Sequence, residues 1–268
     1  MADVANIINL TWFDANSWLI EVAGQRILLD PWLVGDLVFG NLPWLVRGSR
    51  PQPIEIPQNI DLILLSQGLA DHAHPETLQQ LDKSIPVVAS PDGAEIALSL
   101  GFASVTLANH GDTIFPLGDR TLEIRTLKGA VVGPMKRENG YVLTFATGGR
   151  LYYEPHGYPD TAHLADIGSV DVVITPIADV TLMGIAPVVK GGDIPLQIAQ
   201  MLKPQVMLPT AEAGRVTYDG LISQALQTTG GVAELRSRLE ADGKNIRVIQ
   251  PVPEERIELD LQRAVTVL

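Results

Sequence analysis

The segment "SQGLADHAH", Ser66–His74, directly follows the apolar run Leu62–Leu65. A short apolar run bounded by turn residues is typical of a buried strand. The segment is therefore a loop just past a strand end, which is a common place for a metal site or an acid–base site. It carries Asp71, His72 and His74, too few ligands for a complete metal site. The sequence leaves three interpretations: a working site, an altered site, or a remnant.

The composition limits the classes of partner. The chain has 268 residues, 46% of them apolar, so it can form one large domain or two small ones. Its net charge of −12 and pI of about 4.8 argue against a nucleic-acid partner and against an anionic membrane surface. The absence of cysteine excludes disulfides, thiolate metal sites and a cysteine nucleophile. Any metal must be bound by His, Asp, Glu or weaker oxygen donors.

The location is expected to be cytoplasmic. The first residues, "MADVANIINL", carry an acid and no basic region, unlike a signal peptide. The longest apolar region, residues 27–46, is interrupted by charged, amide and proline side chains at Asp30, Pro31, Asp36, Asn41 and Pro43. Such a region does not form a clean transmembrane helix.

Short strand-like runs dominate the first half of the chain. "INLTWF" (8–13), "SWLIEV" (17–22) and "RILLD" (26–30) are separated by turn-sized gaps, which predicts an antiparallel meander. Proline near the start and apolar residues at helical spacing predict helices over 74–82 and 91–101. Further strands are predicted at 85–90, 105–107, 122–127, 141–145 and 151–153.

Three segments of the first half of the chain have similar segments, in the same order, in the second half. "GQRILLDPW" (24–32) resembles "GGRLYYEPH" (148–156), since each has a glycine turn, an arginine, three apolar residues, an acid and a proline. "IDLILLS" (60–66) resembles "VDVVITP" (170–176), and "SIPVVASP" (84–91) resembles "KPQVMLPT" (203–210). The alternative is that all buried strands look alike, but three matches in the same order favour two similar halves.

These patterns predict one domain over residues 1–268, built from two similar β/α halves. Several antiparallel strands in each half imply two sheets packed face to face, with helices outside. The chemistry should then lie where strand-end loops of the two halves meet.

The residues at these loops suggest a metal site. His72, beside Asp71, and His156 both follow strand ends that correspond between the halves. A catalytic zinc needs about three protein ligands, which Asp71, His72 and His156 supply. The alternative is that both histidines are polar loop residues without a common partner, and spacing alone favours it. Asp30 is expected to lie behind the ligands rather than among them.

Five stretches together resemble the metallo-β-lactamase superfamily, over about residues 7–212. Within it the chain looks most like the branch of small metal-dependent hydrolases that includes sugar-lactone lactonases. The resemblance implies a four-layer αββα sandwich of two mixed β-sheets, with a dinuclear zinc or manganese site between the sheets. The stretches are "LTWFDANSWLIEVAGQRILLDPWL", "DLILLSQGLADHAH", "GGRLYYEPHG", "DVVITPIADVTLMG" and "LKPQVMLP".

The metal-binding motif of the family is only half present. Its signature loop is His-x-His-x-Asp-His, and here Gln67 and Leu69 stand where the first two histidines belong. Asp71 and His72 match the last two positions. The resemblance places a further ligand histidine of the family at Lys128 or Gly129.

Three more family ligands fall on other residue types. The metal-bridging aspartate falls on His156, and the last histidine falls on Ala211, with Glu212 beside it. The N-terminal histidine of the related branch falls on Ala15 or Asn16. The resemblance therefore implies at most one metal, zinc or manganese, bound by Asp71, His72, His156 and, with less support, Glu212; a metal-free protein stays open.

Three functions follow from this altered site. The first is a hydrolase with one metal, acting on an ester, lactone or phosphoester, with Asp71, His72 and His156 as catalytic residues. The second is a non-catalytic relative whose cleft binds a ligand or a protein partner. The third is metal-free acid–base chemistry by Asp71 with His156 or His72. We favour the first, with a small-molecule substrate.

The sequence also makes predictions for two features outside the motif, the other histidines and an aromatic loop. His74 is expected to cap the helix that begins at Pro75, and His163 to be exposed on a helix. The loop Trp32–Trp44 contains three aromatic residues. It is a candidate lid or dimer contact, so a homo-oligomer stays open. Equally, its aromatic side chains are expected to pack onto the core.

Overall fold

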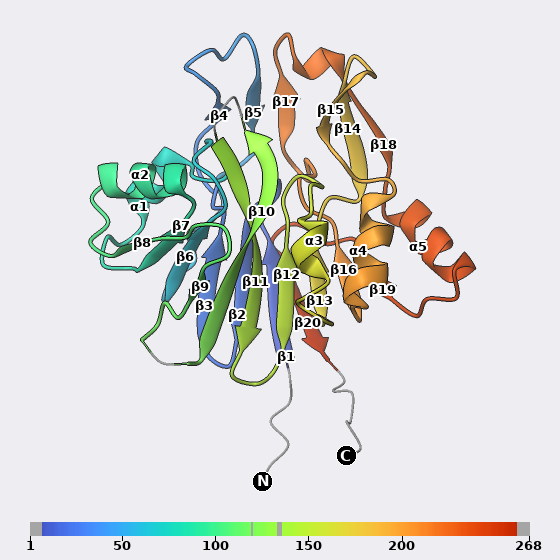
Figure 1. The fold of residues 1–268 in the computed structure, drawn as a ribbon. Coiled ribbons are helices and arrows are strands. Elements are labelled where there is room, and N and C mark those ends of the chain that lie inside the picture. The colour runs from blue at the N-terminus through green and yellow to red at the C-terminus, as the bar shows by residue number, and fades with distance from the viewer. Residues whose placement is uncertain (1–6, 119, 133–135, 262–268) are drawn as a thin grey trace.

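Two seven-stranded sheets form the centre of the protein (Figure 1). The computed structural model describes residues 7–118, 120–132 and 136–261. The first sheet has the order β20 (Arg256–Asp260), β1 (Ile7–Trp12), β2 (Trp18–Val22), β3 (Gln25–Leu29), β6 (Leu62–Leu65), β7 (Val87–Ala89) and β8 (Val105–Leu107). The second has the order β9 (Thr113–Ile114), β10 (Leu122–Val132), β11 (Lys136–Phe145), β12 (Arg150–Tyr153), β13 (Val172–Ile174), β16 (Val206–Leu208) and β19 (Arg247–Val248).

The two sheets have the same pattern of strand directions. In the first, the strands from β20 to β3 pair antiparallel and those from β3 to β8 pair parallel. In the second, the strands from β9 to β12 pair antiparallel and those from β12 to β19 pair parallel. Both sheets are mixed, and β3 and β6 occupy the positions in the first sheet that β12 and β13 occupy in the second.

Helices cover the outer faces of both sheets, so the fold is the predicted four-layer αββα sandwich (Figure 1). Helices α1 (Pro75–Gln80) and α2 (Pro91–Ser99) pack on the first sheet. Helices α3 (Thr161–Leu164), α4 (Ile194–Leu202) and α5 (Val232–Ala241) pack on the second. Proline near the start of α1 and α2 stands where a helix leaves its N–H groups unpaired, which explains why both helices begin there.

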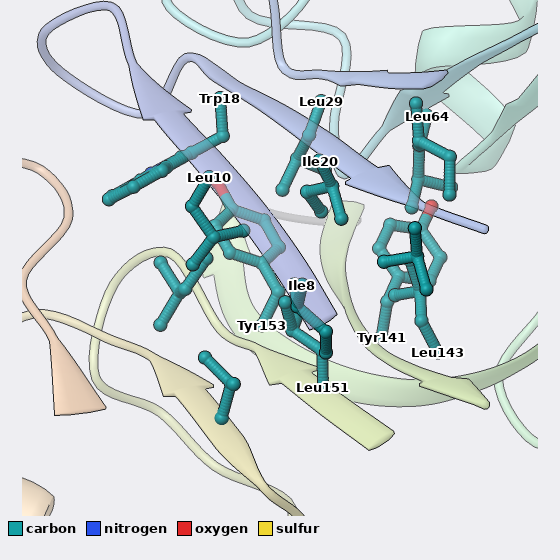
Figure 2. Close-up of a cluster of buried hydrophobic side chains, with 14 of the residues drawn as sticks. Ile8, Leu10, Trp18, Ile20, Leu29, Leu64, Tyr141, Leu143, Leu151 and Tyr153 are labelled. Carbon is teal, nitrogen blue, oxygen red and sulfur yellow. The ribbon is translucent and has the colours of Figure 1, made fainter. Parts of the chain in front are cut away.

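The core between the sheets is built by alternation along the strands. Figure 2 shows Leu151 and Tyr153 of β12 facing Ile8 and Leu10 of β1. Tyr152, between them in sequence, points to the opposite side and packs under the helices of the second sheet. Each of these strands thus contributes to two cores, the one between the sheets and the one beneath the helices on its own sheet.

Two three-stranded sheets lie at the end of the sandwich opposite the described ends of the chain (Figure 1). One consists of β4 (Leu37–Val38), β5 (Arg47–Ser49) and β17 (Thr217–Asp219). The other consists of β14 (Ala178–Leu182), β15 (Ala186–Val189) and β18 (Leu226–Gly230), preceded by a 3₁₀ turn at Ser223–Ala225. Neither small sheet was predicted, because their strands are short and partly exposed and lack apolar alternation.

The Trp32–Trp44 loop belongs to the first of these small sheets. Trp32 is fully buried and packs with Leu37 and Val216, as the core-packing interpretation expects. Trp44 is 63% exposed, and its carbonyl oxygen accepts a hydrogen bond from the backbone N–H of Leu221. A lid or a dimer contact at Trp44 stays a prediction.

The hairpin of β10 and β11 is longer than predicted. The sequence indicated strands over 122–127 and 141–145, whereas the strands run from Leu122 to Val132 and from Lys136 to Phe145. The extension carries charged residues and no apolar alternation, so periodicity could not reveal it. The ladder is interrupted between Lys128 and Val131 by a bulge.

Two neighbouring tyrosines of β12 provide a test of the packing between the sheets. Burial, together with the nearby Asp30 carboxylate, raises the pKa of Tyr153 well above its ordinary 10.0, so the hydroxyl stays protonated. It donates a hydrogen bond of 2.6 Å to Asp30, at the end of β3 in the other sheet. Tyr153→Phe should lower the free energy of unfolding by about 1.5–3 kcal/mol, measured with urea in the presence of a chelator.

The matched control is Tyr152→Phe. The Tyr152 hydroxyl is buried and has no hydrogen-bond partner among the described residues. Removing it should leave the stability unchanged or raise it, because an unpaired buried hydroxyl is a cost. Equal losses in the two variants would contradict the assigned hydrogen bond between the sheets.

Candidate metal and catalytic site

The Ser66–His74 loop is anchored at its start to both large sheets. The backbone N–H of Ser66 donates to Asp30 Oδ1 at 2.7 Å, and its carbonyl accepts from the backbone N–H of Asn139 at 2.9 Å. The carbonyl of Leu69 then accepts from the N–H groups of His72 and Ala73, which closes a turn. This turn directs Asp71 and His72 back toward the space between the sheets.

His74 has the structural role expected of it. It is the N-cap of α1, and its Nδ1 accepts a hydrogen bond from the backbone N–H of Thr77. His163 lies on α3 as predicted, with its side chain 51% exposed and bonded to Asp160. Neither histidine belongs to the site.

His72 is fully buried and its ring is fixed at both nitrogens. Nδ1 lies 2.7 Å from Asp30 Oδ2 and 3.0 Å from the Ser66 hydroxyl. Nε2 lies 3.2 Å from Asp71 Oδ2 and 3.3 Å from the Asn16 amide nitrogen. Burial lowers the pKa of His72, but the carboxylates of Asp71 and Asp30 outweigh it and raise the pKa well above 6.5.

His156 comes from the loop after β12, in the other half of the chain. Its Nδ1 lies 2.7 Å from Glu138 Oε2, and its ring centroid is 5.1 Å from that of His72. Burial lowers the pKa of His156, yet the Glu138 carboxylate outweighs it and leaves the pKa raised. Both imidazoles therefore hold a proton more readily than a free imidazole does.

Glu154 shapes the loop that carries His156. The carboxylate accepts hydrogen bonds from the backbone N–H groups of His156, Gly157 and Tyr158, at 3.2, 2.6 and 3.0 Å. Gly157 has a φ of +78°, and a Cβ there would lie 1.7 Å from the carbonyl oxygen of Lys190. Both features are needed for the chain to turn sharply enough to direct His156 toward His72.

Three of the four predicted metal ligands come together. Asp71, His72 and His156 each offer a ligand atom, and these atoms lie within 4.8 Å of one another. Within the described part of the chain this is the one such group of His, Asp and Glu side chains. Glu212 is not a member of this group, and its carboxylate accepts a hydrogen bond of 2.9 Å from Gln250.

Four other residues stand where the resemblance places ligand histidines of the family, and only some of them lie near the site. Asn16 contacts His72, whereas Lys128 is exposed and does not place its charge among the ligands. Gln67 lies beside the group, and its amide nitrogen donates to Glu138 at 3.2 Å. Leu69 is 42% exposed and lines a cleft next to His156.

Glu138 is the site residue that the sequence did not reveal. It is fully buried on β11 and contacts His156, Gln67 and the backbone N–H of Ala130. It lies in the part of the hairpin that apolar periodicity does not mark. A buried acid is visible in a sequence only when it stands in a recognised motif, and "KRENGY" is not one.

The site contains more acidic than basic side chains. Asp30, Glu138 and Glu154 are fully buried, and Asp71 has a side chain that is 19% exposed. Among the described residues, no lysine or arginine forms an ion pair with any of the four. Buried carboxylates need compensation by a positive charge or by hydrogen bonds. Protonated imidazoles, a metal ion, or a protonated carboxyl must provide it here.

Glu154 shows the effect of this excess. Burial, and next the charge of Glu138, raise the pKa of Glu154 to about 7. The Glu138 carboxyl, by contrast, has a lowered pKa, since His156 overcomes the effect of its burial. The carboxyl group bonded to an imidazole thus stays ionised, while the one bonded mainly to backbone N–H groups holds its proton more readily.

A cleft of about 420 Å³ opens beside His156. Its size is in the range of small-molecule binding sites. Five of the nine lining residues are apolar, and the others are an amide, an imidazole, a guanidinium and a phenol. The lining residues are Gln67, Leu69, Ala130, Val131, Arg137, His156, Tyr158, Pro187 and Val188.

Comparison with known proteins identifies the family of the chain. Residues 9–211 match the family described as the beta-lactamase superfamily domain. The chain belongs to the metallo-β-lactamase superfamily. The structure describes no helix that is long and apolar enough to cross a membrane, within the residues given above.

The curated relatives and several of the similar solved structures carry hydrolase names. A UPF0173 metal-dependent hydrolase from Opitutus terrae is 27% identical over 218 residues, or 75% of this chain and 83% of that protein. One from Agrobacterium fabrum is 23% identical over 186 residues, or 66% and 76%. An isothiocyanate hydrolase from Delia radicum gut bacteria aligns with a TM-score of 0.67 at 15% identity, covering 93% of this chain and 98% of that chain. This last likeness shows a shared fold.

The ion pairs of His72 should make stability depend on pH in the metal-free protein. The raised pKa of His72 means that its contribution is complete below about 6.5 and is lost as the pH rises through the higher folded value. The His72 charge overcomes burial and lowers the pKa of Asp71, so the Asp71 contribution is present above about 3.8 and is lost as the pH falls through the lower folded value. The difference in free energy of unfolding between wild type and His72→Asn should therefore be largest between about pH 4 and 6.5.

The measurement is urea unfolding in the presence of a chelator across that range. His163→Asn is the control: this exposed side chain should change the stability by less than about 0.5 kcal/mol at every pH. A difference between wild type and His72→Asn that does not shrink above neutral pH would contradict the raised pKa.

Proposed function

We propose that the protein is a hydrolase that binds one divalent metal ion through Asp71, His72 and His156. The observation that carries this proposal is the unpaired oxygen of Asp71. Asp71 Oδ1 is buried and has no hydrogen-bond partner among the described residues, although it lies among ligand atoms from two histidines. A buried carboxylate oxygen without a donor is expected where a cation binds.

The donor set fits such an ion. Two imidazoles and one carboxylate are ligands that zinc accepts, and three protein ligands leave a coordination position open. Each histidine also has a carboxylate on Nδ1, Asp30 for His72 and Glu138 for His156. That arrangement is common behind metal-binding histidines, since it fixes the tautomer and leaves Nε2 as the ligand. The Asn16 amide, now 3.3 Å from His72 Nε2, has to release this nitrogen.

A bound divalent ion supplies Lewis acidity, which polarises a carbonyl or phosphoryl oxygen and makes water easier to deprotonate. The side chains of this protein would do the rest. Asp71 would hold the ion through Oδ1, and its Oδ2, now 3.2 Å from His72 Nε2, would orient a water molecule once that nitrogen binds the ion. Glu138 and Asp30 hold the two imidazoles in position, and the apolar walls of the cleft limit access of bulk water to the reacting group.

The cleft favours an uncharged small-molecule substrate. Leu69, Val131 and Val188 provide apolar surface next to His156, and Arg137 is the one arginine or lysine in the lining. A phosphoester usually requires more positive charge to bind. Among the three substrate classes, an ester or a lactone with an apolar acyl group therefore suits the lining better than a phosphoester.

A cytoplasmic location and a homo-oligomer stay predictions.

A non-catalytic, metal-free protein is the second candidate, and one observation favours it. His72 is paired with Asp30 and Asp71, and His156 with Glu138, so the network is largely neutralised without a metal. In that case the cleft binds a ligand or a protein partner, or the Asp71 and histidine pairs perform acid–base chemistry alone.

Metal analysis separates the candidates. We expect one zinc or manganese ion per chain, measured by elemental analysis and calorimetric titration of protein made without a histidine tag. The affinity should rise with pH, because the metal must displace protons from imidazoles whose pKa values are raised. Two tightly bound ions per chain would overturn the ligand assignment, and no binding near neutral pH would favour the second candidate.

Single substitutions test the ligands. His156→Ala should weaken binding by more than about 100-fold, beyond the effect typical of a residue that only supports a ligand. His163→Ala should leave the affinity unchanged, since its side chain is exposed and bonded to Asp160. Hydrolysis of esters, lactones and phosphoesters by the metal-loaded protein then tests the reaction, and activity that persists in His156→Ala would contradict the assigned site.

A further inference from the structure

Glu138 uses both of its carboxylate oxygens within the protein. Oε1 accepts a hydrogen bond from the backbone N–H of Ala130 at 2.8 Å. Oε2 lies 2.7 Å from His156 Nδ1 and accepts a hydrogen bond from Gln67 Nε2 at 3.2 Å. The carboxylate is fully buried and thus has little capacity left for a metal. Its contacts are those of a group that holds other groups in place.

The neighbouring strand is shaped to receive this side chain. The ladder between β10 and β11 pairs Lys128 with Asn139 and then Val131 with Arg137, so Gly129 and Ala130 together face Glu138. Such a bulge leaves backbone groups unpaired. It frees the N–H of Ala130 for Glu138, and a Cβ at Gly129 would lie 2.4 Å from Glu138 Cγ. A side chain at 129 and a glutamate at 138 cannot both occupy this space.

We propose that Glu138 is the positioning residue for His156, and that the Gly129–Ala130 bulge exists to seat it. The carboxylate holds a proton on Nδ1 of His156 and leaves Nε2 directed toward Asp71 and His72. The resemblance places a ligand histidine of the family at Lys128 or Gly129, so this chain has a supporting carboxylate on β11 beside the place where the family has a ligand on β10. The ligand role of Nε2 rests on the proposed function, whereas the position of the proton does not.

The other half of the chain offers an internal comparison. Asp30 lies 2.7 Å from Nδ1 of His72, as Glu138 does from Nδ1 of His156. The two carboxylates come from different places, one from the end of β3 and one from the middle of β11. Each histidine thus has a carboxylate on Nδ1, although the two carboxylates come from different strands. This indicates that the site requires a fixed orientation of both imidazole rings.

Long-range ¹H–¹⁵N NMR of the imidazoles tests the position of the proton directly. In chelator-treated wild type, above the pKa of His156, the ring should carry its proton on Nδ1. Glu138→Gln keeps the size but removes the charge, and should produce a mixture of the two tautomers. An unchanged tautomer in Glu138→Gln would overturn the proposal. In metal-loaded protein the same substitution should lower the affinity for the metal ion by about 10–100-fold. The number of ions bound per chain should stay at one.

A double-mutant cycle tests the bulge. Gly129→Ala should displace Glu138 and reproduce the effect of Glu138→Ala on the His156 spectrum and on metal affinity. In the Glu138→Ala background the clash is gone, so adding Gly129→Ala should have no further effect. Additive effects would show that Gly129 acts independently of Glu138 and would overturn this part of the proposal.

Gly140→Ala is the matched control on the same hairpin. A Cβ there meets its nearest neighbour at 3.4 Å, which is ordinary contact, so His156 should keep its wild-type spectrum. The outcomes also separate the two proposals. If the wild type binds no metal but His156 loses its Nδ1 proton preference in Glu138→Gln, the positioning role stands and the proposed hydrolase function fails.

Discussion

The buried carboxylate of Asp30 connects three parts of the structure that are far apart in the sequence. Asp30 follows the last residue of β3 and accepts hydrogen bonds from the backbone N–H and the hydroxyl of Ser66, which follows β6. It also contacts His72 in the Ser66–His74 loop. It also accepts from the hydroxyl of Tyr153 in the opposite sheet. One acid therefore fixes a strand end, a loop, the packing of two sheets and the orientation of an imidazole. Such a charge remains in the core because each of its contacts is a donor.

The second half of the chain uses the equivalent acid for a related purpose. Glu154 ends β12, as Asp30 ends β3, and the Thr175 hydroxyl after β13 lies 3.5 Å from it, as Ser66 contacts Asp30. Its remaining bonds go to backbone N–H groups of the loop that carries His156. In both halves an acid at a strand end thus positions a histidine, by direct contact in the first and through the backbone in the second. The site forms where these two loops meet.

Much of the fold was predictable because it follows from strong local signals. The meander of β1 to β3 and the helices after β6 and β7 are marked by apolar periodicity and by proline near the helix starts. Asp71, His72 and His156 stood at recognisable strand ends. Glu138 could not be found in this way, because it lies on a hairpin extension without apolar alternation and acts through a bulge at Gly129. The position of Glu212 was equally hidden, since its contact with Gln250 depends on how distant segments fold together.

The replacement of family ligands changes what competes for the site. Where an aspartate would bring negative charge between two metal ions, His156 brings an imidazole that Glu138 encourages to take up a proton. Two neighbouring dications would repel each other with little charge between them to offset the repulsion. In the proposed function, a proton and a single metal ion are alternative ways to balance the same buried carboxylates. Metal binding by the proposed ligands would therefore depend on pH as much as on the number of ligands, because the ion has to replace protons on the imidazoles.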